Sequence, residues 1–102
     1  MKDFSITILT NKGRNVVHLA ASNTENYDAL RVFLEMGYFD ANTPDNSGNT
    51  ALHYACECSG LDMIEMLVSE FNADVNAVDK TKQTPAHIAA YNGDLGKFIN
   101  IM

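Results

Sequence analysis

A short pattern recurs along this chain at a nearly constant interval, and that interval limits the folds available to it. Each copy contains a histidine followed two positions later by two small residues, and the three histidines are 35 and 34 residues apart. The aligned segments are GRNVVHLAA at 13–21, GNTALHYAC at 48–56 and KQTPAHIAA at 82–90. A period of this length is typical of repeat proteins, in which each unit is one supersecondary element that stacks on its neighbours.

Each unit predicts two helices joined by a turn. Asn15, Thr50 and Thr84 stand where a side-chain oxygen can cap a helix, and Pro85 follows at a position where a missing N–H costs nothing. A second segment of each unit carries apolar residues at helical spacing: Tyr27, Leu30 and Leu34; Leu61, Ile64 and Val68; and Leu95, Phe98, Ile99 and Met102. Since one such pair cannot bury its own apolar face, we expect about three units to stack.

The residues quoted above resemble the ankyrin repeat. The family signature Thr-Pro-Leu-His-x-Ala-Ala is closest to residues 84–90, and the family linker Ala-Asp-Val-Asn-Ala-x-Asp is intact at 73–79. The resemblance covers roughly residues 4–102. It implies an all-α solenoid of stacked helix-turn-helix pairs joined by short hairpin-like loops.

The length of 102 residues allows one domain, which we expect to span residues 1–102. Its expected parts are a preceding linker or hairpin at 4–14, repeat 1 at 15–49, repeat 2 at 50–83 and a partial repeat 3 at 84–102. The last segment ends in an apolar surface that includes Phe98, Ile99, Ile101 and Met102 and that a free-standing array would normally cover. The simplest interpretation is a fragment of a longer ankyrin-containing protein. The alternative is a small complete protein that self-associates through this end.

The chain departs from the repeat pattern in a few places. One extra residue falls in the first inter-helix turn, at 22–28, and one falls in each linker, near Phe39 and near Phe71. We expect these insertions to lie between helices, where the stack tolerates them. At the loop position that Gly48 holds in the second unit, the third unit has Lys82, an unusual occupant if the backbone there is left-handed.

Charge and cysteine content restrict the partners and the compartment. The formal net charge is -6 and the seven basic residues do not cluster in sequence, which disfavours a nucleic-acid partner. No apolar run approaches the roughly 18 residues of a membrane helix, and no export signal is visible. Cys56 and Cys58 would point in nearly opposite directions on a helix and so cannot bridge each other. These features favour an intracellular, cytoplasmic protein without a membrane partner.

The histidines and cysteines invite a catalytic or metal-binding interpretation, which the spacing disfavours. Equivalent residues of stacked units lie about 8 to 10 Å apart, too far to share one zinc ion. The family resemblance implies a structural role for His18, His53 and His87, as donors to loop backbone. Cys56 lies three residues after His53 but is most simply a buried substitute for alanine. We therefore expect no catalytic residues, no metal and no cofactor.

Two asparagines share a sequence context. Asn42 and Asn76 both follow the pattern Asp-x-Asn-x-x-Asp, which looks like the setting in which intracellular hydroxylases modify ankyrin asparagines. The alternative is structural: the side chain bonds to local backbone and holds the loop together. We favour the structural role.

The family's binding face, transferred to this sequence, comprises the loop tips and the exposed side of the first helices. The tip residues are Lys12, Arg14, Asn46, Ser47, Asn49, Lys80, Thr81 and Gln83. The helical residues are Leu19, Ser22, Tyr54, Glu57, Ile88 and Tyr91. Tyr54 and Tyr91 are the candidate anchors, because tyrosine combines a large contact area with a polar tip. Alternatively, these two rings only cover the surface between repeats.

The sequence thus predicts a non-catalytic module that binds another protein through its concave face. The rival hypothesis is a structural or self-associating segment of a larger multidomain protein whose activity lies elsewhere. An enzyme is a distant third, since neither a nucleophile with its own base nor a glycine-rich phosphate loop is present.

Overall fold

The computed structural model describes residues 14–37, 39–58 and 60–93, and this part of the chain is helical, with no strand. The elements are α1 (Val16–Ala21), the 3-10 turn η2 (Thr24–Asn26), α2 (Tyr27–Glu35), α3 (Ala51–Cys58), α4 (Leu61–Glu65), the π-helical turn η3 (Met66–Glu70) and α5 (Pro85–Tyr91). The predicted all-α class is therefore confirmed.

The predicted caps start the helices where the sequence places them. The Asn15 side chain accepts hydrogen bonds from the amides of Val17 and His18, at 2.8 and 3.2 Å. The Thr84 hydroxyl accepts the amide of His87 at 3.3 Å, and Pro85 fills the first position of α5. Each cap satisfies amides that have no partner inside the helix, so it fixes the first turn.

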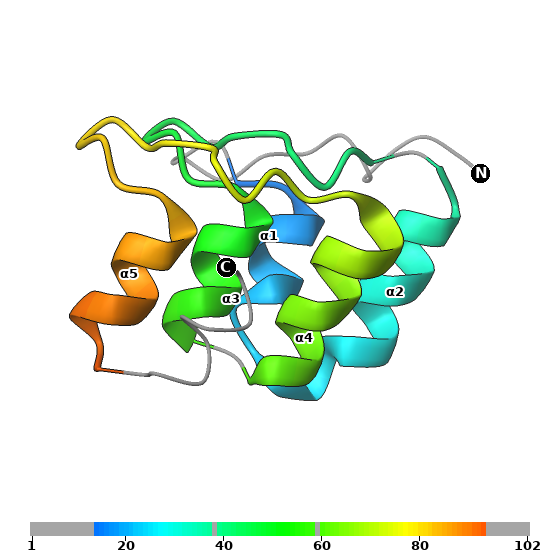
Figure 1. The fold of residues 1–102 in the computed structure, drawn as a ribbon. Coiled ribbons are helices and arrows are strands. Elements are labelled where there is room, and N and C mark those ends of the chain that lie inside the picture. Colours follow the sequence, from blue (N-terminus) through cyan, green and yellow to red (C-terminus); the bar gives the residue numbers. More distant parts are fainter. Residues whose placement is uncertain (1–13, 38, 59, 94–102) are drawn as a thin grey trace.

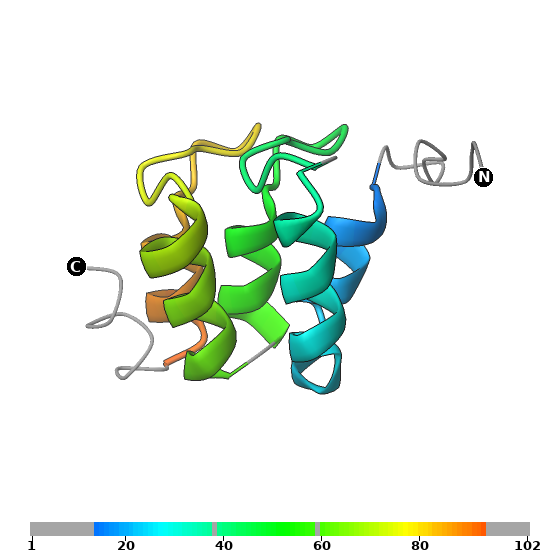
Figure 2. The same cartoon turned by 90° about the vertical axis from the view of Figure 1, so that its right-hand side faces the viewer.

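The helices form two layers. The inner layer consists of α1, α3 and α5, in which α3 packs between the other two, while α2 packs on α1 and α4 on α3 (Figures 1 and 2). The loops that connect the units run along one edge of the stack (Figure 1). This is the arrangement of stacked helix-turn-helix pairs that the repeat predicts.

Small side chains let the inner helices approach one another, and larger ones fill the space toward the second layer. Ala21, Ala55 and Ala89 are at most marginally accessible to solvent on α1, α3 and α5. The large buried side chains come mainly from the second helices and from α3: Leu30, Leu34, Leu52, Met63, Ile64, Met66 and Leu67. The core is thus continuous across the units, as a repeat array requires.

One insertion is not where the sequence analysis placed it. The extra residue near Phe71 does not lengthen the linker. It is absorbed inside the second helix, because the chain widens into the π turn η3 before Asn72 ends the helix in the left-handed conformation, with φ 56. The amide of Ala73 then donates to the carbonyl of Leu67 at 2.9 Å, six residues earlier. A π turn is how a helix takes in one residue without shifting its buried face.

The loops have the predicted hairpin-like closure without forming strands. Asp45 donates its amide to the Asn49 carbonyl at 2.8 Å, and Asp79 does the same to Gln83 at 3.0 Å. Lys82 has φ 69, close to the φ 83 of Gly48, so its predicted left-handed backbone is confirmed.

The same two positions differ in their surroundings. A Cβ atom on Gly48 would lie 2.9 Å from the Cα of Asp79 in the next loop, a separation that real Cβ atoms do not show. Gly48 is therefore required for the close approach of two loops as well as for its φ.

Candidate protein-binding face

Two of the three histidines connect structural elements, whereas the hydrogen bonds of the His87 side chain within the described residues are limited to its own capping residue, Thr84. His18 and His53 accept the backbone amide of their own capping residue at Nδ1, both at 3.0 Å. Their Nε2 atoms lie 2.8 Å from the Thr43 carbonyl and 3.0 Å from the Gln83 carbonyl, in the following loop. Since Nδ1 accepts, Nε2 carries the proton and donates to that carbonyl. The geometry agrees with the predicted structural role for these two residues.

Burial affects the titration of the first of these rings. His18 is buried, and this desolvation lowers its pKa below the usual 6.5, although the Thr43 carbonyl and the Asp45 charge act in the opposite direction. A charged imidazole would also have to give up the hydrogen bond that Nδ1 accepts. The folded structure therefore holds His18 neutral.

The thiols and acids of the described ranges do not assemble around an ion. Cys56 is buried, Cys58 is exposed, and neither forms a disulfide bond within the described residues. No group of three or more histidine, cysteine, aspartate or glutamate side chains comes together within residues 14–37, 39–58 and 60–93.

Tyr54 lies in a cluster with residues of the first unit. Its hydroxyl donates to Oδ2 of Asp45, and its ring meets the His18 ring edge-on, with centroids 5.8 Å apart. The Arg14 guanidinium lies 6.0 Å from the Tyr54 ring centroid. Burial and the Asp45 carboxylate together raise the pKa of Tyr54 to about 12. Tyr54 is half-buried and committed to these contacts, which favours the alternative interpretation that it covers the surface between units.

The other carboxylate oxygen of Asp45 binds the loop backbone. Its Oδ1 accepts the amides of Ser47 and Asn49, both at 2.9 Å. Burial alone would raise the pKa of Asp45, but the Tyr54 hydroxyl and these two amides outweigh it and lower that pKa below its usual value. The Asp45 carboxylate is thus ionised and fully occupied.

A hollow of about 460 Å³ lies beside Asp79 and Ile88, which stand 34 residues after Asp45 and Tyr54. We call it the second groove, and its lining residues are Asn49, Glu57, Asp79, Gln83, Ile88, Tyr91 and Asn92. Five of them belong to the predicted face, while Asp79 and Asn92 were missed. The signal for Asp79 was available, because it stands 34 residues after Asp45 in the same loop position.

The other predicted residues are dispersed. Asn46, Ser47, Lys80 and Thr81 are exposed in the loops, and the Ser22 hydroxyl donates to the Leu19 carbonyl at 2.7 Å. Leu19 lines a separate apolar hollow of about 320 Å³, together with Val16, Ala20, Asn26, Ala29 and Phe33. Lys12 lies outside the described residues.

The two predicted anchors differ most in exposure. Tyr91, at the end of α5, is 86% exposed and lines the second groove. The ring of Tyr91 is therefore accessible, whereas that of Tyr54 is largely covered by its contacts within the chain.

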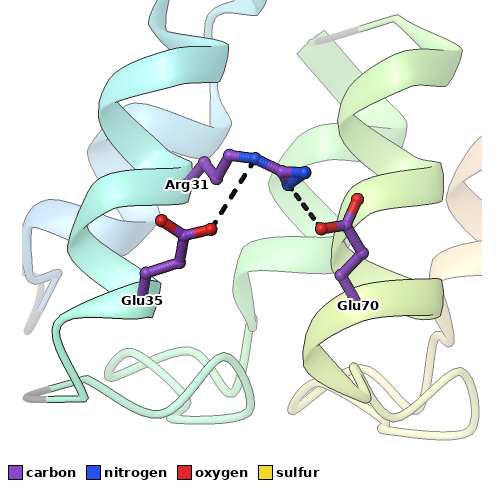
Figure 3. Close-up of polar contacts among 3 residues, drawn as sticks. All are labelled: Arg31, Glu35 and Glu70. Carbon is purple, nitrogen blue, oxygen red and sulfur yellow. Dashed lines mark hydrogen bonds and ion pairs between the residues drawn. The ribbon is translucent and has the colours of Figure 1, made fainter.

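On the opposite layer, charged side chains link the second helices. Arg31 of α2 lies between Glu35, one turn along the same helix at 3.8 Å, and Glu70 of η3 (Figure 3). Arg31 therefore connects the second helices of two units. No helix in the described part of the chain is long and apolar enough to cross a membrane.

Comparisons with known proteins agree with the geometry. A family model described as "Ankyrin repeats (3 copies)" matches residues 2–79. The chain is similar to alpha-latrotoxin-Lg1a of Latrodectus geometricus, with 29% identity over 96% of the chain. It is also similar to the human transient receptor potential cation channel subfamily A member 1, with 34% identity over 90% of the chain. A third relative is the ankyrin repeat and LEM domain-containing protein 1 homolog of Caenorhabditis elegans, with 40% identity over 72% of the chain.

These alignments cover only a small part of the relatives. The chain spans 7%, 8% and 10% of their respective lengths. The similarity therefore concerns the repeat array and not the whole proteins.

Proposed function

Because the chain belongs to the ankyrin-repeat family, whose repeats are generally non-catalytic protein–protein interaction modules, we propose that it binds a partner protein through the face formed by its loops and inner helices. The observation that carries this proposal is the second groove, with the 86% exposed Tyr91 at its border. Tyrosine is among the residues enriched in protein-binding hot spots, and hot-spot residues cluster around pockets that the partner fills. The net charge of -6 supports a protein partner over nucleic acid.

Site-specific photo-crosslinking tests this proposal. A photoreactive phenylalanine analogue placed at Tyr91 should capture a partner from native lysate, and the same analogue at Asp62, exposed on α4, should not. Capture from Asp62 alone would place the interface on the second helices and contradict the proposal.

The self-association hypothesis is supported by a separate observation. The apolar hollow that includes Leu19 and Phe33 is lined only by residues of the first unit among those described, so it faces away from the rest of the described stack. Another helical unit, from a longer chain or a second copy, would bury it. The predicted apolar C-terminal end lies outside the described residues.

Light scattering after size-exclusion chromatography separates the two hypotheses. A monomer at all concentrations supports a free binding face. A concentration-dependent dimer that Leu19→Lys abolishes supports association through the first unit, and a dimer that survives this change points to another surface.

The expected intracellular location remains a prediction.

A further inference from the structure

The proposed binding face contains two positions that are equivalent by the repeat, and different side chains occupy them. By the repeat offsets of 34 and 35 residues, Asp79 and Ile88 correspond to Asp45 and Tyr54, and Asn49 corresponds to Arg14. In the first place, the Tyr54 hydroxyl donates to Asp45 Oδ2 and the Arg14 guanidinium lies over the Tyr54 ring. The chain thus occupies this place with its own phenol and its own cation.

At the second position, the corresponding side chains supply neither a phenol nor a cation. Ile88 has no hydrogen to donate, and Asn49 carries no charge. The hollow of about 460 Å³ opens here, lined by both residues.

Asp79 accepts loop amides as Asp45 does, but it has no counterpart of the Tyr54 hydroxyl that donates to Asp45. Its Oδ1 accepts the amides of Thr81 and Gln83, both at 2.9 Å, and the Thr81 hydroxyl at 2.7 Å. Among the described residues, none donates a hydrogen bond to its Oδ2. Burial would raise the pKa of Asp79, but the Gln83 amide and the Thr81 hydroxyl and amide lower it overall, so the carboxylate is ionised at neutral pH.

The rest of the lining adds a second negative charge and an aromatic ring. The Glu57 side chain is exposed and makes no hydrogen bond or ion pair within the described ranges. Tyr91 presents its ring to solvent. The lining includes no lysine, arginine or histidine, since Lys80 and Lys82 of the same loop do not contribute to it. The second groove is therefore complementary to a cation with several N–H donors.

We propose that the second groove binds an arginine side chain from a basic segment of the partner protein, an assignment that rests on the proposed function. The guanidinium donates to Asp79 Oδ2 and to the Glu57 carboxylate and lies against the Tyr91 ring. Arginine fits better than lysine because its planar group both stacks on an aromatic ring and donates in two directions. The contact between Arg14 and Tyr54 in the preceding unit is the internal precedent.

The test begins with a random dodecapeptide library panned on the full 102-residue chain. Selected peptides should be enriched in arginine, and replacing the critical arginine by citrulline, its neutral analogue, should weaken binding at least about tenfold, because the ureido group keeps N–H donors but has no positive charge to pair with the two carboxylates.

Matched variants locate the site. The pair Glu57→Gln and Asp79→Asn removes both charges but keeps the oxygen that accepts the loop amides, and should weaken binding of the selected peptide at least about tenfold. The control pair Asp62→Asn and Glu65→Gln removes two carboxylates that line a hollow on the second helices, and should change affinity less than about twofold. Ile88→Tyr should fill the second groove as Tyr54 fills the first and abolish binding. Circular dichroism confirms that each variant is folded.

Each other outcome contradicts the inference. Peptides without arginine, peptides indifferent to citrulline, or an absence of any selected peptide overturns it. Binding that survives Ile88→Tyr but is lost in Tyr91→Ala overturns the arginine site and leaves the concave face as the interface. Binding lost only in the Asp62 and Glu65 pair overturns both the arginine site and the proposed function.

Discussion

Two histidine rings each connect a helix cap to the following loop, and the position of the ring proton determines which nitrogen accepts and which donates. The Nδ1 atom of His18 or His53 accepts the amide of a helix cap, while Nε2 donates to the next loop. One ring thereby satisfies two backbone groups that belong to different elements. Protonation of His18 at Nδ1 removes the first of its two bonds, so this connection depends on a neutral His18 ring.

Acid should therefore destabilise the protein below about pH 6.5. The folded pKa of His18 is lower than its usual 6.5, so the unfolded chain binds more protons in this range, and the free energy of unfolding decreases as pH falls below that value. Urea midpoints at pH 7 and pH 5 measure the effect. His18→Gln should lower stability at pH 7 and reduce the difference between the two pH values. An unchanged difference would show that His18 does not titrate with unfolding.

The Tyr54 hydroxyl should contribute to stability, because it donates to a buried carboxylate. Tyr54→Phe leaves the ring in place and removes the hydrogen bond to Asp45, which should lower the free energy of unfolding by about 1 to 2 kcal/mol. Tyr91→Phe is the matched control and should have no effect, since Tyr91 is 86% exposed. Equal effects of the two substitutions in urea melts would contradict the assigned role of Tyr54.

Glycine at the left-handed loop positions should matter unequally. Lys82→Gly should raise stability by up to about 1 kcal/mol by relieving the left-handed backbone of a residue with a side chain. Gly48→Ala should lower stability by more than that, because the new Cβ would also press on the Asp79 backbone of the next loop. Thermal melts of the two variants measure both shifts. A lower midpoint for Lys82→Gly would mean that the lysine side chain has a stabilising contact.

At the scale of the elements, the sequence predicts those features that depend on residues close together in the chain. The starts of α1 and α5 were predictable, since Asn15 and Thr84 act on amides within three residues. The π turn was not predictable. Its position depends on which side chains the core accepts, and the buried Met66 and Leu67 keep their places only if the extra residue widens the helix.

The same reasoning applies to the candidate site. The repeat alignment located the loop tips and inner helices, but it could not show that Tyr54 folds back on Asp45, nine residues earlier. That contact depends on the loop conformation and on packing against His18. Nor did the predicted binding face include Asp79, whose Oδ2 accepts no hydrogen bond from the described residues, a feature that only the structure shows.

Asn42 links two loops and is not limited to the local bonds that its sequence context suggested. Its side chain donates to the Asn72 carbonyl at 3.2 Å and accepts the Asp74 amide at 2.6 Å, both in the next unit. Asn76 occupies the equivalent position, but its exposed side chain makes no such bond to the described residues. Hydroxylation of either asparagine stays a prediction.

Removing these bonds should therefore affect one asparagine more than the other. Asn42→Ala should lower the free energy of unfolding by about 1 to 2 kcal/mol, because it deletes two hydrogen bonds between units. Asn76→Ala, the matched control, should change it by less than about 0.5 kcal/mol. Urea denaturation compares them, and equal losses would mean that the Asn42 contacts are not what stabilises the interface between units.

Across the whole molecule, neighbouring units are joined at both edges of the stack. The amide of Lys80 donates to the Ser47 carbonyl at 2.9 Å along the loops, and Arg31 connects α2 to Glu70 of η3 on the second layer (Figure 3). In an array of this kind, stability is approximately a sum of unit and interface terms. The loops and inner helices are consequently held in one geometry across the units, which would lower the ordering cost of the proposed binding.

The affinity of a captured partner for two single variants tests the concave-face assignment most directly. Tyr91→Ala should weaken binding by about 2 kcal/mol, as expected for an aromatic anchor, and Val32→Ala, which truncates a 52% exposed side chain on α2, should change it by less than about 0.5 kcal/mol. Isothermal titration calorimetry measures both values on variants shown to be folded. If Val32→Ala weakens binding and Tyr91→Ala does not, the interface lies on the second helices and the concave-face assignment is wrong.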